Sequence, residues 1–573
     1  MMDKRALLAI LLTFLVIFFW STIQSKFFPQ PPPDQPKKEV KKEEVIPAEK
    51  IGVKPLKEDR TVHKPQIVIK KETSVETKNY IAIFTNEDAR LNHFKLKKYE
   101  DRVEESSFTI KLTQFIQNLL GGKVSEPKKP ELLDLVNTKE EEGLPLGLIF
   151  QPSPDSGGWE VDKEKLQLLK EGEKGEVIFT KTLYNSLKLL KKYKFNSGNN
   201  ILDLEVEVQN PSPKEITTQL GLEWVGRMEL EKFSDDGNKD FGLKYAFFKN
   251  QKVERRDLGG TSASGCTPGC GSAKKKVDPF EFSDQGAIGW YAFEGEYFTA
   301  LLVPPSSEKS LLFSVKGDDR NIIKANLASP PLSLRPGEAV RKAYQVYLGP
   351  KVTEPLKELG VGAEGLIDFG FFTIVAKPLL WFLKLTNTVT KNFGIDIIIL
   401  SILIKIIFLP LTQISMKSMK EMQKVQPEMN RLKEQFKNDK ARVQQELMLL
   451  YKRRKINPMS GCLPMVIQIP VFIALYNALQ NSIEMRHAPF ILWIMDLSAK
   501  DPIYITPIIM GATMVLQQKM TPTAADPAQA KIFMLMPIMF TFLFLNFPSG
   551  LVLYWMVTNI LSIAHQYYMN KKR

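Results

Sequence analysis

A long stretch without charged side chains near the C-terminus restricts the fold more than any other feature. Residues 532–570 include no Lys, Arg, Asp or Glu over 39 positions. As one helix, this stretch would be roughly 58 Å long, nearly twice the ~30 Å hydrocarbon core of a bilayer. The segment NFPSG at 546–550 has the composition of a turn. We therefore predict two membrane-spanning helices joined by this turn.

Four further apolar stretches are long enough to span a membrane. Residues 397–416 contain one charge, Lys405, whereas residues 462–483 and 502–518 contain none. The fourth stretch lies in 1–25, where Lys4 and Arg5 precede an apolar run that no small-residue cleavage site follows. This pattern favours an uncleaved anchor over a signal peptide. The sequence thus predicts six transmembrane helices: an N-terminal anchor in residues 1–25 and a core of five helices in 365–573.

The part of the chain between the anchor and the core has two different compositions. Residues 26–66 are rich in Pro, Lys and Glu, which predicts an extended tether. Residues 67–352 contain short runs in which apolar and polar side chains alternate, the clearest being ILDLEVEVQ at 201–209. Alternation with period two is typical of half-buried antiparallel strands. We predict a β-sandwich domain on the side of the membrane opposite the N-terminus.

Basic residues predict the orientation of the core. The segment 412–460 carries twelve Lys and Arg against five Asp and Glu. Because cytoplasmic loops are enriched in basic residues, this segment and both chain termini are expected in the cytoplasm. Its apolar residues recur every three or four positions, which predicts a coiled-coil hairpin of two helices. The stripe of Met416, Met419 and Met422 is either the seam of this hairpin or an adaptable surface for hydrophobic segments of other proteins.

Composition and motifs argue against catalysis. The net charge of +14 is compatible with an anionic partner such as a ribosome or anionic lipid. The sequence has no GxxxxGK[ST], HExxH or GxSxG motif, and its four histidines are scattered. We therefore predict no enzyme activity, cofactor or metal site. Cys266 and Cys270 in CTPGC form either a local disulfide or free thiols, and the sequence leaves both open.

A lysine within the apolar segment SILIKIIFLP is the most unusual residue of the predicted core. A charged side chain at the centre of a membrane helix costs about 2.5–3.5 kcal/mol on insertion scales. Lys405 either extends its ammonium toward the cytoplasmic interface or faces a hydrated pocket between the helices. Stripes of polar residues at helical spacing favour the pocket, and the longest comprises Trp555, Asn559, Ser562 and Gln566. The predicted spans provide no Asp or Glu to neutralise the lysine.

Several motifs of the core resemble one known family. The segments IIILSILIKIIFLPLTQISMKSMKEMQ, INPMSGCLPMVIQIPVFIALYNAL, EMRHAPFILWIMDLS and FPSGLVLYWMVTN closely resemble the bacterial YidC membrane protein insertases. The segment DQGAIGWYAFEGEYFTALLVP resembles the long form of this family, which has a periplasmic domain. The resemblance implies a bacterial inner membrane location. It also implies that the β domain is a periplasmic supersandwich similar to sugar mutarotases.

The family resemblance implies a positively charged hydrophilic groove that is open to the cytoplasm and the lipid. Lys405 stands where the family typically has arginine, and this keeps the charge but not the planar guanidinium. Trp555 takes the second place of the family's paired tyrosines. The implied groove residues are Lys405, Ser401, Gln468, Gln518, Tyr554, Trp555 and Asn559.

The implied function is insertion and folding of inner-membrane proteins, alone or with the Sec translocon and without nucleotide. The implied partners are nascent membrane proteins, the Sec translocon, a transiently bound ribosome and membrane lipids, with no direct nucleic-acid contact. Because the chain ends at NKKR, ribosome contact would use the hairpin and the loop 519–531. Two other functions stay open: a secondary transporter for an anionic solute, against which the sequence shows no inverted repeat, and a membrane receptor whose β domain binds an envelope ligand.

Overall fold

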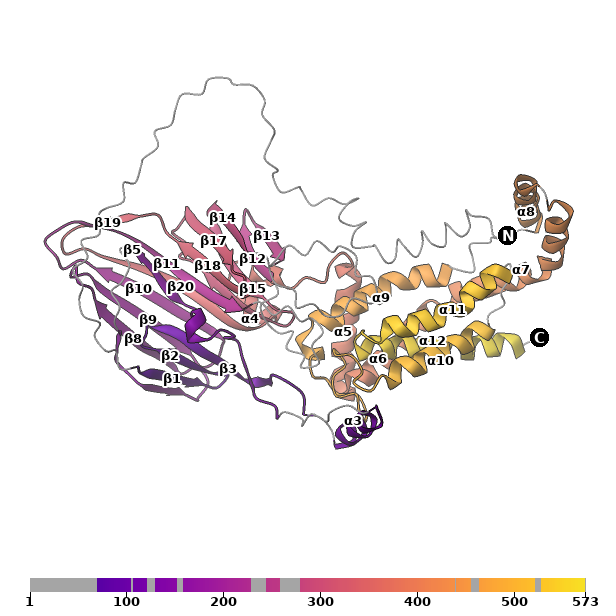
Figure 1. Ribbon diagram of the computed structural model, residues 1–573, viewed down its shortest axis with the longest axis horizontal. Helices are drawn as coiled ribbons and strands as arrows, with labels where there is room; N and C mark the ends of the chain where they lie inside the picture. Colours follow the sequence, from indigo (N-terminus) through magenta and orange to yellow (C-terminus); the bar gives the residue numbers. More distant parts are fainter. Residues whose placement is uncertain are drawn as a thin grey trace, which may run out of the picture. The chain divides into compact units, whose positions relative to one another are not determined.

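The computed structural model describes residues 70–104, 107–120, 129–151, 158–227, 244–257, 279–437, 439–454, 463–520 and 527–571 (Figure 1). The chain divides into two units. One unit, Met1–Lys64 with Thr523–Met536, lies almost wholly outside the described residues, and the other comprises 65–522 and 537–573. The predicted anchor in 1–25, the whole tether in 26–66, and the pair Cys266 and Cys270 lie outside the described residues.

The β-rich region consists of three sheets of mainly antiparallel strands. The five-stranded sheet has the order β4 (Leu132–Asp134), β3 (Arg90–Glu100), β2 (Tyr80–Thr85), β1 (Glu72–Thr77) and β7 (Lys165–Leu168). The nine-stranded sheet has the order β13 (Lys252–Asp257), β12 (Lys244–Lys249), β15 (Ile288–Glu294), β16 (Phe298–Val303), β20 (Ala339–Pro350), β10 (Ile201–Gln209), β9 (Lys188–Asn196), β8 (Lys174–Thr182) and β6 (Glu160–Val161).

The six-stranded sheet completes the domain. Its order is β14 (Phe280–Gly286), β17 (Leu311–Gly317), β18 (Ile322–Ala328), β11 (Ile216–Arg227) and β19 (Leu332–Leu334), with β5 (Gly147–Gln151) paired to β11. Short helical elements accompany the sheets: α3 (Ser107–Leu120), η1 (Glu140–Glu142), α4 (Thr353–Glu358) and η2 (Ala363–Leu366). Helix α3 was not expected, because the sequence analysis assigned only strands to this part of the chain.

Aromatic contacts show how the three sheets form a sandwich. Tyr291 of β15 and Phe313 of β17 join the nine-stranded sheet to the six-stranded one, with ring centroids 5.3 Å apart. Phe84 of β2 and Tyr193 of β9 join the five-stranded sheet to the nine-stranded one at 4.5 Å. Both smaller sheets therefore pack against the nine-stranded sheet and share one hydrophobic core with it.

Strand β10 shows why the alternating sequence forms this sandwich. Its pairing partners are β9 and β20, both antiparallel. Leu202, Leu204, Val206 and Val208 are all buried, as the alternation predicts, whereas the residues between them are exposed or half-buried. Successive strand residues point to opposite faces, so the apolar set lies in the core. Complete burial of each such side chain contributes about 1.5–3 kcal/mol.

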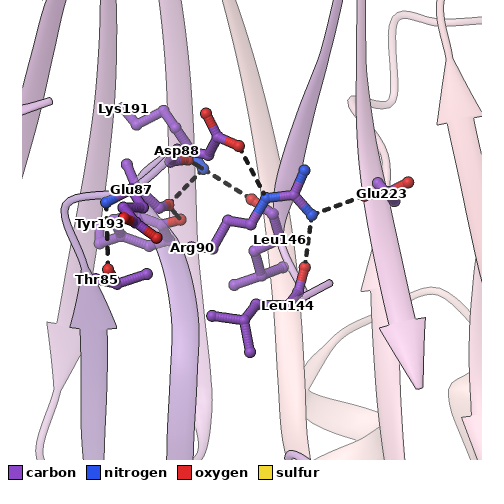
Figure 2. Close-up of polar contacts among 10 residues, drawn as sticks. Thr85, Glu87, Asp88, Arg90, Leu144, Leu146, Lys191, Tyr193 and Glu223 are labelled. Atoms are coloured by element: carbon purple, nitrogen blue, oxygen red, sulfur yellow. Dashed lines mark hydrogen bonds and ion pairs between the residues drawn. The ribbon is translucent and has the colours of Figure 1, made fainter. Parts of the chain in front are cut away.

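One lysine occupies a core position in the sandwich. Lys191 lies on the inward face of β9 with Tyr193 and Phe195 and is fully buried. Its ammonium donates hydrogen bonds to the backbone carbonyls of Ala89, at 2.6 Å, and Leu146, at 2.7 Å (Figure 2). Burial away from water, and secondarily the nearby Arg90 charge, lower the pKa of Lys191 well below its usual range. The backbone carbonyls thus compensate for a charged group in the core.

A second cation lies beside this lysine in Figure 2. The Arg90 guanidinium donates to the Leu144 carbonyl at 2.8 Å and to the Glu223 carboxylate at 2.7 Å. Arg90 and Glu223 also line a cavity of about 380 Å3 whose other walls include Glu140, Glu141 and Glu142. Arg90 and Lys191 together hold the β2–β3 turn and the segment 144–146 in place.

The helical region follows the sandwich in the chain. Its elements are α5 (Thr373–Thr390), α6 (Phe393–Ile407), α7 (Leu409–Gln435), α8 (Lys440–Arg454), α9 (Leu463–Asn481), η4 (Ile483–Met485), α10 (Ile505–Met520), α11 (Pro527–Phe544) and α12 (Ser549–Lys571). Helices α11 and α12 are separate, and the residues between them, 545–548, include the first three residues of NFPSG, whose Ser549 and Gly550 begin α12. Residues of α5, α6, α9 and α12 share one hydrophobic core.

The predicted span over 397–416 is broken into two helices. Helix α6 ends at Ile407, α7 begins at Leu409, and the two axes differ in direction by 60°. Pro410 lies in the first turn of α7, where its missing N–H costs no helical hydrogen bond. The ring restricts the residue before it and cannot continue the preceding helix. The proline therefore explains the break close to Lys405.

Within the described ranges, no helix taken alone has both the length and the hydropathy of a membrane span. Taken together, the bent pair α6 and α7 meets both the length and the hydropathy criterion. Residues Met534–Phe544 form a shorter apolar helix.

Helices α7 and α8 pack on each other through an apolar seam. Buried Val425 and Met429 of α7 contact Leu447 and Tyr451 of α8. Arg454 and Glu428 form an ion pair of 2.5 Å beside the seam. Met422 packs against the same seam, and Met416 is buried earlier in α7. Two of the three predicted methionine contact residues therefore have packing roles within the chain.

Candidate functional site: polar contacts along helix α12

Helix α12 carries a row of polar side chains that contact three other helices. From the N-terminal end of the helix, the row comprises Tyr554, Asn559 and Ser562, all buried. Tyr554 accepts a hydrogen bond from Gln468 of α9 at 3.4 Å, and Asn559 donates one to Thr513 of α10 at 3.4 Å. Ser562 contacts Lys405 of α6. We call Tyr554, Asn559 and Ser562 the polar row.

Lys405 is the only cationic member of these contacts in the described part of the chain. Its ammonium lies in the last turn of α6 and donates to the Ser562 hydroxyl at 2.7 Å. An ammonium has three protons to donate, and Ser562 accepts one of them. No carboxylate of the described residues lies within ion-pair distance of Lys405. The lysine therefore keeps capacity for an anionic or polar partner.

The Lys405 contact requires residues far apart in the sequence. Lys405 and Ser562 are 157 positions apart and come from the first and last helices of the predicted five-helix core. Isoleucines on α6, Ile402, Ile406 and Ile407, remain exposed beside the lysine. Helix α6 thus combines a polar contact toward α12 with an apolar surface suited to lipid.

Trp555 has a different environment from Lys405. Its ring packs against Phe472 at 5.2 Å, edge to face, and against Phe544 at 5.4 Å. Phe540 stacks on it at 6.1 Å. The indole N–H is buried without a hydrogen-bond partner among the described residues. The structure thus places Trp555 in an aromatic cluster with α9 and α11, away from the polar contacts of the row.

The remaining predicted groove residues are distributed over α6 and α10. Ser401 is buried, and its hydroxyl donates to the Ile397 carbonyl of its own helix at 2.7 Å. This bond satisfies the hydroxyl within α6, although the residue lies one turn from Lys405. Gln518 is half-buried in the last turn of α10. Lys405, Gln468, Tyr554 and Asn559 are the predicted residues that the polar row brings into contact with a second helix.

Two partners, Ser562 and Thr513, were not among the implied groove residues. Ser562 belongs to the polar stripe of the last predicted span, three residues after Asn559, but its contact with Lys405 was not predicted. Their partners depend on how α6, α10 and α12 pack. Within the described ranges, no group of three or more His, Cys, Asp or Glu side chains is arranged to hold a metal ion.

Comparisons with known proteins agree along the whole chain. The model of the 60Kd inner membrane protein family matches residues 384–573, and that of the YidC periplasmic domain matches residues 123–382. A membrane protein insertase YidC of Syntrophus aciditrophicus is 40% identical over 592 residues, which cover 100% of both chains. That of Geotalea daltonii is 37% identical over 578 residues, covering 100% of this chain and 99% of its own.

Among solved structures, a similar one is described as an active YidC insertase crystal structure with the first transmembrane domain resolved. It is 19% identical, covers 87% of this chain and 92% of its own, and has a TM-score of 0.35.

The matches define the chain as an inner-membrane protein with a periplasmic domain. More particularly, it belongs to the YidC family of membrane protein insertases, which are not enzymes. The resemblance that the sequence motifs indicated is thereby confirmed.

Proposed function

We propose that this protein inserts and folds inner-membrane proteins, alone or beside the Sec translocon, through a hydrophilic groove centred on Lys405. The observation that carries the proposal is the environment of that lysine. Among the described residues its ammonium donates a hydrogen bond to the Ser562 hydroxyl and forms no ion pair with a carboxylate. A positive charge held in an apolar helical region attracts anionic groups more strongly than it would in water.

The proposed step begins when a hydrophilic, often acidic, segment of a nascent protein enters the groove from the cytoplasm. Lys405 attracts the segment, while Ser562, Asn559 and Gln468 provide uncharged hydrogen-bonding groups along α12 and α9. The polar path across the bilayer is then shorter. Ser401, Gln518, Tyr554 and Trp555 complete the proposed groove.

The client's apolar segment would slide along exposed apolar residues and enter the lipid. Met534, Met539 and Phe542 of α11 are exposed and suit this role. Transfer of apolar surface from water contributes about 25 cal/mol per Å2, which requires no nucleotide. The hairpin of α7 and α8, with Met416, Met419 and Met422, is the proposed first contact for clients and for a transiently bound ribosome.

The proposed topology has six transmembrane helices, with both termini in the cytoplasm and the β domain in the periplasm. Basic residues concentrate in α7 and α8, which supports a cytoplasmic hairpin. No observation on the described residues favours the alternative of a transporter for an anionic solute.

Substitutions at Lys405 test the proposed groove. Purified variants would be reconstituted in liposomes, and insertion of a small client with an acidic translocated tail would be measured by protease protection. Lys405→Arg should retain most activity. Lys405→Ala should lose roughly ten- to hundredfold, because a hydrogen bond to a charged group contributes about 1.5–3 kcal/mol, and Lys405→Glu should lose more.

The matched control is Lys417→Ala, since Lys417 is an exposed lysine of α7. If Lys405→Ala inserts the client as fast as the wild type, the Lys405 ammonium only extends toward the interface, and the proposed groove is rejected.

A further inference from the structure

The last turns of α12 contain a histidine that the proposed groove does not yet use. His565 lies three residues after Ser562, so the two side chains are neighbours on the helix surface. Both ring nitrogens, Nδ1 and Nε2, are buried and have no hydrogen-bond partner among the described residues. His565 itself is half-buried, and an unpaired buried polar atom costs about 1–3 kcal/mol. Both nitrogens can therefore gain from a hydrogen-bonding partner.

Lys405 is close enough to His565 to interact with it electrostatically. The same ammonium donates to Ser562, so Lys405, Ser562 and His565 form one cluster between α6 and α12. The cluster contains two groups able to donate hydrogen bonds to an anion, and it contains no carboxylate. Its composition therefore matches a ligand with a carboxylate group.

The helices around His565 supply cations rather than a carboxylate partner. Helix α9 has no charged residue, and α10 has only Lys519. Helix α7 approaches the end of α12 through Lys420, which donates to the Met569 carbonyl at 3.0 Å. The neighbouring Glu421 is paired with Lys424 at 2.7 Å. On α12 itself the charged residue within the described range is Lys571.

From this arrangement we infer that His565 is a second client-binding residue, specific for acidic segments. A client carboxylate held between Lys405 and His565 accepts hydrogen bonds from the lysine ammonium and from a protonated imidazole. The bound carboxylate neutralises the lysine charge and makes the imidazolium a favourable partner, so client binding takes up a proton from water. This inference rests on the proposed insertase function and adds a substrate preference with a pH dependence.

The test compares two clients and two pH values in proteoliposomes containing the full chain. One client has two aspartates in its translocated tail, and the matched client has asparagines at the same positions. At pH 6.5 the wild type should insert the aspartate client roughly three- to tenfold faster than at pH 8.0, because binding is linked to uptake of up to one proton. The asparagine client should be inserted at the same rate at both pH values.

Two substitutions at one position make the result specific. His565→Gln keeps hydrogen-bonding capacity but stays neutral. The ratio of the insertion rates at pH 6.5 and pH 8.0 should therefore fall to about one, and insertion should be slow at both pH values. His565→Lys carries its charge at both pH values and should be fast at both. His93→Gln is the matched control: that histidine lies in the β domain beside Asp134 and should leave the ratio unchanged.

The inference is overturned if His565→Gln keeps the wild-type ratio, or if the asparagine client shows the same ratio as the aspartate client. Lys405→Ala at pH 8.0 separates this failure from failure of the groove itself. If Lys405→Ala is defective but His565→Gln keeps the wild-type ratio of insertion rates, only the role of His565 is rejected. A fully active Lys405→Ala rejects the proposed groove and the inference together.

Discussion

Two lysines, one in each structural region, lie in apolar surroundings and differ in how their charges are compensated. Lys191 in the β-sandwich is fully buried and donates to the carbonyls of Ala89 and Leu146, with the Asp88 carbonyl at 3.4 Å. The Tyr193 ring also lies 5.5 Å from its ammonium. Lys405 in the helical region contacts one hydroxyl, that of Ser562.

The difference separates a structural lysine from a binding one. All the donors of Lys191 have acceptors supplied by rigid backbone, so the site has no capacity for a ligand. Lys405 has one acceptor, and its environment includes the unpaired nitrogens of His565. An incompletely compensated charge costs stability and is retained where it serves a function.

Removal of the Lys191 ammonium should have the largest effect. Lys191→Met keeps the approximate shape but removes the lysine donor from the Leu146 carbonyl and leaves the Ala89 carbonyl with the Tyr193 hydroxyl as its side-chain donor. We expect the free energy of unfolding of the β domain to fall by about 3 kcal/mol. Denaturant unfolding followed by tryptophan fluorescence measures this change.

Lys192→Met is the control, because Lys192 is the next residue of β9 and points to the outer face. It should change stability by less than about 0.5 kcal/mol. Equal stability of Lys191→Met and the wild type would show that the carbonyls are hydrated instead, and Lys191 would no longer count as structural.

A smaller effect is expected from the single partner of Lys405. Ser562→Ala removes one hydrogen bond, worth about 0.5–1.5 kcal/mol, and keeps the charge. The initial rate of insertion of the acidic client should therefore fall roughly threefold. If Ser562→Ala were as defective as Lys405→Ala, the hydroxyl rather than the ammonium would be the main binding group. Thr558→Ala on the same helix, whose hydroxyl bonds its own backbone at Tyr554, is the control.

The smallest predicted effect is a pH dependence of stability. The pKa of Lys191 is lowered in the folded protein, mainly by burial, so the unfolded chain binds more protons between that lowered value and the ordinary 10.5. Stability therefore rises with pH in this interval.

The measurement compares unfolding free energies of the wild type and Lys191→Met at pH 7, 8 and 9. The advantage of the wild type should widen as the pH rises. A constant difference would mean that the ammonium stays protonated in both states throughout this range.

Local sequence patterns were sufficient for much of the secondary structure. The alternation in 201–209 predicted β10 and its buried face, and the charge-free stretch 532–570 with its proline-containing turn predicted α11 and α12 as separate helices. Lys405 was identified because a single charge in an apolar run is visible without any tertiary contact. The motifs around it also indicated the family that the comparisons confirm.

Other features could not be recognised in the same way. Lys191 interrupts the apolar face of β9, between Leu189 and Tyr193, and its compensation by the carbonyls of Ala89 and Leu146 depends on loops about 100 and 45 positions away. The break at Phe408 lies inside the apolar run, because the geometry of Pro410 interrupts a helix that hydropathy alone would continue.

Local patterns in the chain specify which elements form and that a positive charge lies among the apolar helices, because periodicity and hydropathy act over a few neighbouring residues. Helix packing selects the partners of these residues. It placed Ser562 against Lys405 across 157 positions, directed Trp555 into an aromatic cluster and left the His565 nitrogens unpaired among the described residues. These outcomes depend on how the helices pack, and packing joins residues whose separation in the chain carries no local signal.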